Sequence, residues 1–484
     1  MSSSNITEIR RVLRGPAKCG LDLGDGSERA EYVSQDYILQ TLGRPHRNIS
    51  LMYTYYPYDK EWPQRISKAC KDMEIHFQWD YPYDDYFPYG GGLQGNTEGE
   101  PFSCMRDVRK HGQDVTLTLT IDCKVKEEDL RQIARELKPF GRMRLRINHE
   151  CAGDWFTHNR RYSHKEIGDF FVKFKNIIKE EAPNISVIFC AGGATENGEL
   201  QFEQDFLGGY TGADIWSLDC YLALHYGWPF DVCEKDVQSY STHTIEGFYD
   251  FLRKTATRLI QVNDGAEKPL VISEFNTDGD VTGPRRQGES IRKFMDVVKR
   301  EDDSWFSGLT YYQFRDRGRL GLEIEDPNNQ EIGIAQPVME DYKEILKDPY
   351  FMPSLTELEE VKLPVQLRWG GAEDAEGISF SVSLEGAPEF FELTFDEEVN
   401  LMIDVNGRWY YKAPETKTID VMPSFWHDTW NAGDKVTITM FAPPATGEND
   451  ASQGDDWAEN YYQTITRLPK LRIRYEAVAD IQDK

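Results

Sequence analysis

The feature that most constrains this chain is a regular alternation, between about residues 49 and 350, of short apolar runs and longer segments with helical periodicity. Eight runs are predicted to be strands: residues 49–55, 74–79, 115–122, 143–150, 186–191, 214–221, 270–275 and 309–314. Strands that alternate with helices pair in parallel, so eight such units predict an α/β chain folded as a closed (β/α)8 barrel, the TIM barrel. In an alternative assignment, residues 14–23 form the first strand and residues 74–79 lie in a loop insertion.

Helical periodicity is clearest after Ser163, which forms a predicted capping box with Glu166. Apolar residues then recur on one side of the predicted helix at positions 167, 170, 171, 174, 177 and 178. Residues 126–137 and 245–262 show the same spacing. Such stripes are typical of amphipathic helices, as expected between the strands of the barrel.

The pattern changes near residue 348 and predicts a second domain. After a linker at residues 351–364, the strand-like runs are short and separated by Gly, Pro, Asn and Asp turns, as at residues 378–384, 391–395, 399–405, 435–441 and 470–475. We predict a barrel at residues 49–350 and a C-terminal β-sandwich accessory domain at residues 365–484. Residues 1–48 are expected to pack on the barrel as an extension, or to hold its first strand.

Charge and hydropathy limit the partners of the chain. It carries 55 basic and 83 acidic residues, a formal net charge of −28. Nucleic-acid binding depends on a basic surface, so no nucleic-acid partner is expected. No stretch reaches the roughly 18 to 20 apolar residues that span a bilayer, and the first residues lack the apolar core of a secretory signal. We therefore predict a cytoplasmic protein with no membrane partner, and the oligomeric state is left open.

Two glutamates stand at the ends of predicted strands. Within residues 142–150, apolar side chains alternate with Arg144, Arg146 and Glu150. If the apolar side faces the helices, Glu150 points into the barrel at the carboxyl end of its strand, which is where barrel enzymes carry their chemistry. Residues 269–276 end in the same way with Glu274. By the strand count, the two glutamates close strands four and seven.

Paired carboxylates are suited to glycoside hydrolysis. A protonated acid gives its proton to the leaving oxygen while a carboxylate about 5 to 5.5 Å away attacks the anomeric carbon, and the first group later activates water. We therefore predict a retaining β-glycoside hydrolase that works by double displacement and needs no cofactor. Glu150 is its expected acid/base and Glu274 its expected nucleophile.

A metal site is the competing interpretation of His149-Glu150. The zinc protease pattern needs a second histidine three residues after the glutamate, where this chain has Gly153. The sequence holds only nine histidines, and its eight cysteines include no CxxC pair, so we expect reduced, buried thiols and no metal. Two alternatives stay open: a metal-dependent hydrolase, and a carbohydrate-binding protein without activity on a glycosidase barrel.

The segment RINHECAGDWF resembles the signature of glycoside hydrolase family 26, the β-mannanase family. That family lies in a clan of retaining (β/α)8 enzymes with their two acids on strands four and seven. The matching residues are Arg146, His149, Glu150, Gly153, Asp154, Trp155 and Phe156. Residues 210–221 and 271–275 are similar to the family's sixth and seventh strands.

The resemblance implies roles for several side chains. His149 is expected to contact the sugar in the cleavage subsite, Trp155 to stack on a sugar ring, and Tyr221 to bond the nucleophile. A β-mannan or β-mannoside substrate is favoured. The chain departs from the wider clan at Asn148, which stands two residues before the acid instead of next to it, and strand eight lacks the clan's tryptophan.

Aromatic loops follow several predicted strands, at residues 53–58, 79–89 and 226–230, and contain Trp79 and Trp228. Because loops at this end of a barrel build the cleft, we expect them to bind carbohydrate together with Asn148 and Arg146. Five arginines either accommodate a carboxylated sugar or pair with nearby acids: Arg144, Arg146, Arg315, Arg317 and Arg319. Five aromatics of the second domain either bind sugar or pack on the barrel: Trp409, Tyr410, Tyr411, Trp426 and Trp430.

Overall fold

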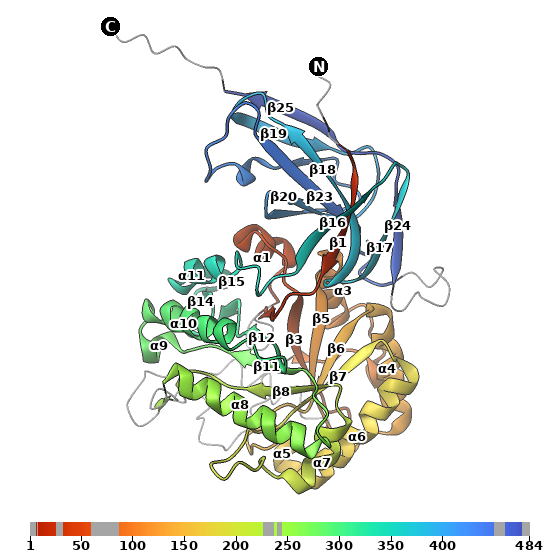
Figure 1. The fold of residues 1–484 in the computed structure, drawn as a ribbon. Coiled ribbons are helices and arrows are strands. Elements are labelled where there is room, and N and C mark those ends of the chain that lie inside the picture. The colour runs from red at the N-terminus through yellow and green to blue at the C-terminus, as the bar shows by residue number, and fades with distance from the viewer. Residues whose placement is uncertain are drawn as a thin grey trace.

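The structure is a computed structural model that describes residues 6, 8–25, 32–59, 87–225, 237–239, 244–449 and 460–476. It has a barrel and a β domain, one above the other (Figure 1). No helix within these ranges is both long and apolar enough to cross a bilayer.

Eight parallel strands close into a barrel, which confirms the predicted fold class. In chain order they are β2 (Gly20–Gly24), β3 (Asn48–Tyr55), β5 (Asp114–Ile121), β6 (Met143–Ile147), β7 (Ile185–Cys190), β8 (Ile215–Asp219), β11 (Leu270–Phe275) and β12 (Phe306–Tyr311). Strand β2 pairs with both β12 and β3 and so closes the sheet.

The first barrel strand is β2, as in the alternative assignment, so the barrel begins before residue 49. Its five residues, Gly-Leu-Asp-Leu-Gly, contain two glycines and no β-branched residue, and they therefore give a weak strand signal. The strand expected at residues 74–79 lies outside the described residues. Because β2 is added before β3, Glu150 and Glu274 still follow strands four and seven.

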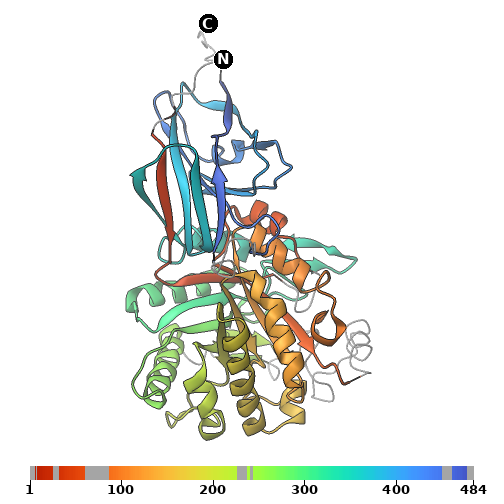
Figure 2. The ribbon, with the colours of Figure 1, turned by 90° about the vertical axis from the view of Figure 1, so that its right-hand side faces the viewer.

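Helices surround the barrel (Figure 2). The long ones are α1 (Gln35–Leu42), α3 (Phe102–Lys110), α4 (Glu127–Leu137), α6 (His164–Glu181), α7 (Glu203–Gly212), α8 (Ile245–Val262), α10 (Arg286–Glu301) and α11 (Val338–Ile345). Short turns are α5 (Thr157–Arg161), α9 (Gly279–Thr282), η1 (Gly92–Gln94) and η2 (Lys138–Phe140). Helix α6 has the predicted capping box of Ser163 and Glu166, and its six predicted apolar positions are buried.

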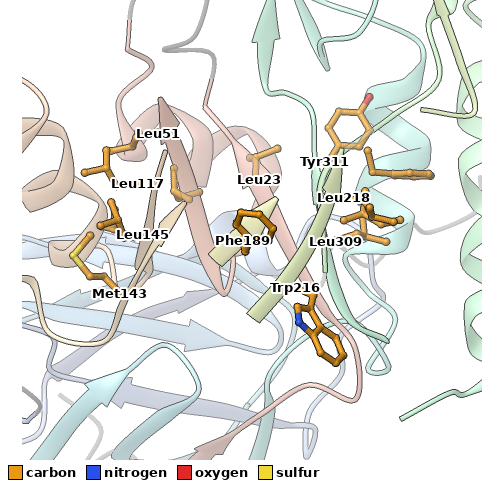
Figure 3. Packing of buried hydrophobic residues seen from close by; sticks show 14 of the residues in the cluster. Leu23, Leu51, Leu117, Met143, Leu145, Phe189, Trp216, Leu218, Leu309 and Tyr311 are labelled. Carbon is orange, nitrogen blue, oxygen red and sulfur yellow. The ribbon is translucent and has the colours of Figure 1, made fainter. Parts of the chain in front are cut away.

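The main core lies between the strands and these helices. Figure 3 shows part of it, including Leu51 of β3, Leu117 of β5 and Leu145 of β6. Met143 and Ile147 belong to the same core, so the predicted alternation along β6 is confirmed. Described cysteines are free thiols: Cys19, Cys104, Cys123, Cys151, Cys190 and Cys220.

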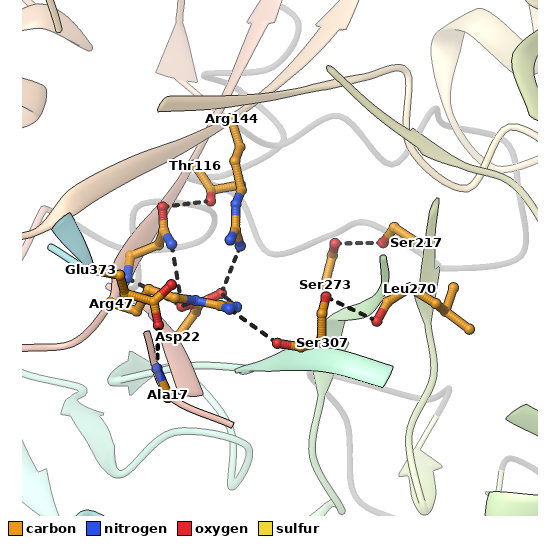
Figure 4. A network of polar contacts seen from close by, with 11 residues as sticks. Ala17, Asp22, Arg47, Thr116, Arg144, Ser217, Leu270, Ser273, Ser307 and Glu373 are labelled. Atoms are coloured by element: carbon orange, nitrogen blue, oxygen red, sulfur yellow. Dashed lines mark hydrogen bonds and ion pairs between the residues drawn. The ribbon is translucent and has the colours of Figure 1, made fainter. Parts of the chain in front are cut away.

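The barrel interior is polar at its amino end (Figure 4). Asp22 accepts hydrogen bonds from Arg47 at 2.8 and 2.6 Å and from Arg144 at 3.2 Å. Arg144 therefore pairs with an acid inside the barrel and is not placed to bind a carboxylated sugar. Glu373 of the β domain reaches this end and accepts a hydrogen bond from the Ala17 N–H at 3.0 Å.

The second domain consists of antiparallel sheets, as predicted. Its larger sheet holds β1 (Arg10–Gly15), β16 (Ser354–Glu360), β17 (Val365–Gly371), β18 (Asp374–Ser383), β20 (Leu401–Val405), β21 (Arg408–Lys412), β23 (Lys435–Phe441) and β24 (Tyr461–Ile465). Its smaller sheet holds β19 (Pro388–Thr394), β22 (Thr418–Asp420) and β25 (Lys470–Tyr475), and the turn η5 (Met422–Ser424) lies nearby.

Two segments assigned elsewhere from the sequence belong to this domain. Strand β1, expected in an extension on the barrel, pairs with β16 and β18 (Figure 2). Strand β16 lies in the predicted linker, and nearly all of its residues are exposed. An edge strand of this kind carries no apolar alternation, so its sequence resembles a loop.

The β domain contacts the amino end of the barrel, away from the carboxyl ends of the strands. The Asp114 carboxylate at the start of β5 accepts a hydrogen bond from the Ala372 N–H at 3.1 Å. Trp409 is buried, and its backbone N–H donates to the Gly43 carbonyl at 2.8 Å. The ring centres of Tyr411 and His111 lie 3.8 Å apart. Packing on the barrel is therefore the correct interpretation for Trp409 and Tyr411.

The remaining strands are not among the eight that close the barrel. They are β4 (Phe87–Pro88), the pair β9 (Ala223–His225) and β10 (Val237–Ser239), and the small sheet β13 (Arg315–Asp316), β14 (Glu323–Asp326) and β15 (Asn329–Ala335). The small sheet follows β12, so it belongs to the loops at the carboxyl ends of the strands.

Candidate active site

Glu274, the expected nucleophile, lies on β11 with both carboxylate oxygens bound. Arg146 Nη2 donates to Oε1 at 2.8 Å, and the Tyr221 hydroxyl donates to Oε2 at 2.8 Å. The second contact is the one expected from the family resemblance. These two donors fix the orientation of the Glu274 carboxylate.

Arg146 connects four strands at the base of the site. Its side chain is fully buried, and Nε donates to Thr118 Oγ1 of β5 at 2.7 Å. Nη1 donates to the two Asp219 oxygens of β8 at 2.6 and 2.7 Å, while Nη2 bonds Glu274 of β11. Arg146 thus positions carboxylates, and these contacts leave it no role as a direct ligand for a carboxylated sugar.

Asp219 is a site residue that the sequence interpretation missed. It lies beside Glu274 in the register of β8 and β11. Burial raises its pKa, while the ion pair of both its oxygens with Arg146 acts in the opposite direction and favours the anion. The sequence does contain a signal for Asp219, because alternation along residues 215–221 puts Ser217, Asp219 and Tyr221 on the same side of the strand. A third buried acid here adds negative potential around the other two.

Glu150 reaches the site by a turn and not by strand alternation. Strand β6 ends at Ile147, and both Asn148 and Glu150 adopt left-handed backbone conformations, with φ of 45° and 49°. Asn148 fixes this turn: its Oδ1 accepts from the Ile121 N–H at 2.7 Å, and its Nδ2 donates to the Ile121 carbonyl at 3.1 Å. The Asn148 amide is thereby committed to the backbone of β5, which indicates a structural role in place of direct sugar binding.

The carboxyl group of Glu150 has different surroundings from that of Glu274. Its pKa is raised well above the usual value, first by burial and then by the negative charges of Glu274 and Asp219. A hydrogen bond from Trp155 and the charge of Arg146 act in the opposite direction and are smaller effects. The surroundings of Glu150 therefore favour its protonated form, which is the form that can act as an acid.

His149 and Trp155 each approach one of the two glutamates. His149 is buried with Nε2 3.7 Å from Glu274 Oε1, and burial together with Arg146 lowers its pKa well below the usual value, so the ring is neutral. The Trp155 indole donates from Nε1 to Glu150 Oε2 at 2.6 Å. Sugar contacts of these two residues remain predictions.

Potential metal ligands also gather here. Donor atoms of His149, Asp219 and Glu274 all lie within 4.8 Å of one another. However, the Arg146 guanidinium already bonds both carboxylates, and its positive charge opposes a second cation in the same space. The arrangement therefore fits an arginine-bridged carboxylate pair better than a metal centre.

Some of the other residues predicted to line the cleft lie outside the described residues, and others make contacts within the protein. Trp79 and Trp228 lie outside the described residues. At the end of strand eight, where the clan's tryptophan is missing, buried Tyr312 packs edge-on against Tyr221 with ring centres 5.8 Å apart. Three of the arginines pair with acids: Arg315 with Glu323, Arg317 with Glu325 and Arg319 with Asp280.

Comparisons with known proteins show distant structural likenesses and no family. No protein-family model matches the chain, and no curated protein matches its sequence. The structure is similar to a family 51 arabinofuranosidase from Xanthomonas axonopodis pv. citri, with a TM-score of 0.42 and 10% identity over 90% of this chain and 100% of that one.

Two further solved structures show a comparable likeness. A family 39 glycoside hydrolase from Bacteroides cellulosilyticus has a TM-score of 0.43 and 11% identity, over 88% of this chain and 81% of that one. A family 26 endo-β-1,4-mannanase from Bacillus sp. has a TM-score of 0.43 and 13% identity, over 70% of this chain and 88% of that one. The resemblance is a distant one in fold, shared with several glycoside hydrolase families.

Proposed function

We propose that this protein is a retaining β-glycoside hydrolase in which Glu274 is the nucleophile and Glu150 the acid/base. The observation that carries the proposal is the difference between the surroundings of the two carboxyl groups. Glu274 accepts two hydrogen bonds that favour its anion, whereas burial and two neighbouring negative charges favour the protonated form of Glu150. A glycosidase needs this division between attacking group and acid at neutral pH.

In the first step, a Glu274 oxygen attacks the anomeric carbon and forms a covalent glycosyl ester. Glu150 transfers its proton to the glycosidic oxygen as that bond breaks, so the leaving sugar departs as an alcohol. The negative charge of Glu274 is consumed in this step, and Glu150 becomes the anion. Arg146 and Tyr221 hold the attacking carboxylate in place during the step.

In the second step, Glu150 takes a proton from water as that water attacks the anomeric carbon. The ester bond to Glu274 breaks, and the free sugar leaves with its original β configuration. Both acids then return to their starting protonation states. Neutral His149, beside Glu274, is suited to hydrogen-bond a sugar hydroxyl in the cleavage subsite.

The substrate we propose is a β-linked oligosaccharide, with β-mannosides favoured by the resemblance of residues 146–156 to the β-mannanase signature. A cytoplasmic location fits short imported oligosaccharides better than intact polymer. Trimming of such chains is therefore the activity to examine first.

The proposal can be tested on a panel of aryl β-glycosides and β-linked oligosaccharides. NMR follows the anomeric configuration of the product. We expect a β product first, loss of turnover by at least about 10³-fold in Glu274→Gln, and azide rescue of Glu150→Ala on a substrate with a good leaving group. Glu340→Gln, an exposed position on α11, is the matched control and should keep full activity.

Three results would change the assignment. An α product would exclude double displacement. Sugar binding with no hydrolysis on the whole panel would favour the carbohydrate-binding alternative. Activity that is lost in chelator and restored by a divalent cation would favour a metal centre at His149, Asp219 and Glu274.

A further inference from the structure

Trp155 contacts Glu150 through the N–H group of its indole ring. Trp155 Nε1 lies 2.6 Å from Glu150 Oε2. An indole N–H can only donate, and hydrogen bonds to an ionised carboxylate are shorter and stronger than those to a neutral acceptor. The geometry therefore suits the anionic form of Glu150 better than its acid form.

The indole is held in this orientation by its neighbours. Trp155 packs against Phe156 and Met52, which form a small apolar cluster. Gly153 provides the room for this: a methyl group there would lie 2.5 Å from two ring carbons of Trp155. The Gly153 N–H also closes the turn by bonding the Glu150 carbonyl at 2.9 Å. Trp155 and Glu150 are thus fixed on one short, closed loop.

The two steps of the reaction need different forms of Glu150. In the first step it must carry a proton, and in the second it must be an anion that accepts one. A donor aimed at its oxygen helps the second step and opposes the first. Burial and the nearby carboxylates already favour the acid form, so the anion is the state that needs support.

We propose that Trp155 is a positioning residue for Glu150, whose indole N–H holds the carboxylate as the base of the second step. This role rests on the proposed function and adds to it, because the family resemblance implies only sugar stacking for Trp155. The Trp155 side chain is only partly buried.

Trp155→Phe separates the two roles, because phenylalanine keeps an aromatic face and removes the N–H. With the 2,4-dinitrophenyl β-glycoside that the wild-type protein hydrolyses best, we expect kcat to fall about 10- to 100-fold. The value of kcat/KM should change less than about threefold, since that leaving group needs little acid assistance. A burst of dinitrophenol equal to the enzyme concentration should precede the slow phase, and azide should accelerate the variant alone.

The pH profile gives a readout that a purely structural role would not move. Loss of a donor to the carboxylate raises the pKa of Glu150. On a substrate whose leaving group needs acid assistance, the alkaline limb of kcat/KM should therefore move up by about one pH unit. Gly153→Ala, which displaces the indole without removing it, should act in the same direction. Trp305→Phe, a buried position on the barrel's outer wall that packs on Tyr249, is the control and should leave the profile unchanged.

Equal losses in kcat and kcat/KM, with no burst and no shift of the alkaline limb, would overturn this role for Trp155. A wild-type protein inactive on every substrate would instead contradict the proposed function. NMR titration of ¹³C-labelled glutamate carboxyl groups then tests the hydrogen bond in the absence of substrate. The Glu150→Gln variant assigns the Glu150 signal. A Glu150 midpoint that does not rise in Trp155→Phe would exclude the hydrogen bond.

Discussion

At the scale of single residues, one guanidinium serves two carboxylates. Arg146 bonds Glu274 through Nη2 and Asp219 through Nη1, so each acid shares the positive charge with the other. If Arg146 were paired with Glu274 alone, it would stabilise that anion more strongly and make it a weaker nucleophile. Asp219 also adds to the negative potential that keeps Glu150 protonated. Asp219 therefore affects both of the carboxyl groups to which we assign the catalytic roles.

Asp219→Asn tests this coupling. Removal of the charge lowers the pKa of Glu150, so the protonated acid is lost at lower pH and the alkaline limb of kcat/KM should move down by about one unit. We expect kcat at neutral pH to fall about 10- to 100-fold. The shift is opposite in sign to that of Trp155→Phe, and the two pH profiles should be measured together. An unchanged limb in Asp219→Asn would show that Asp219 has no electrostatic effect on Glu150.

At the scale of elements, the turn after β6 decides where the acid lies. Two residues with positive φ, Asn148 and Glu150, take the chain out of the strand, and the Asn148 amide ties it to Ile121 of β5. Asparagine tolerates the left-handed conformation better than most residues, while a glutamate there is strained. The neighbouring strand thus supports a backbone conformation that the local sequence would not adopt alone.

Two substitutions of Asn148 separate its hydrogen bonds from its backbone preference. Asn148→Gly loses both bonds to Ile121 but accepts positive φ, and should cost about 2 kcal/mol in the free energy of unfolding. Asn148→Ala should cost about 1 kcal/mol more, because alanine disfavours the left-handed region. Urea unfolding measures both values. Equal losses in the two variants would mean that backbone strain contributes nothing at this position.

At the scale of the whole molecule, the first and last described strands, β1 and β25, both belong to the β domain, and the barrel lies between β1 and β16 in the sequence. Arg14 is buried beneath Trp409, with its guanidinium carbon 5.2 Å from the ring centre. Glu373 reaches the amino end of the barrel and offsets the positive charges of Arg47 and Arg144. These contacts predict that the two domains unfold together.

Two tryptophans of the β domain provide a matched test of this cooperativity. Trp409 is 4% exposed at the domain interface, whereas Trp426 is 67% exposed. Trp409→Ala should cost about 3 to 5 kcal/mol and split the unfolding transition in two, while Trp426→Ala should cost less than about 0.5 kcal/mol. Circular dichroism and activity are measured in the same urea titration. The two transitions show as different midpoints in the two signals. A single transition in Trp409→Ala would show that other interface contacts suffice.

Much of the fold could be predicted from the sequence because its causes are local. The stripe of six apolar residues and the Ser163–Glu166 capping box fix α6 within its own segment. Seven of the eight barrel strands carry their own apolar signal, and that pattern led to the barrel and to strands four and seven as the locations of Glu150 and Glu274. Strand β2 lacked such a signal because it consists of two glycines, two leucines and an aspartate.

What only the tertiary structure decided depends on residues far apart in the chain. Strand β1 pairs with strands more than 300 residues later, and the edge strand β16 has no apolar alternation that could assign it to a sheet. Asp219 gains its importance from Arg146, 73 residues before it, and from its neighbour Glu274 on the next strand. The sequence by itself determined which acids lie at the carboxyl ends of the strands. Their charge states follow from burial and shared hydrogen bonds, which exist only once the barrel has closed.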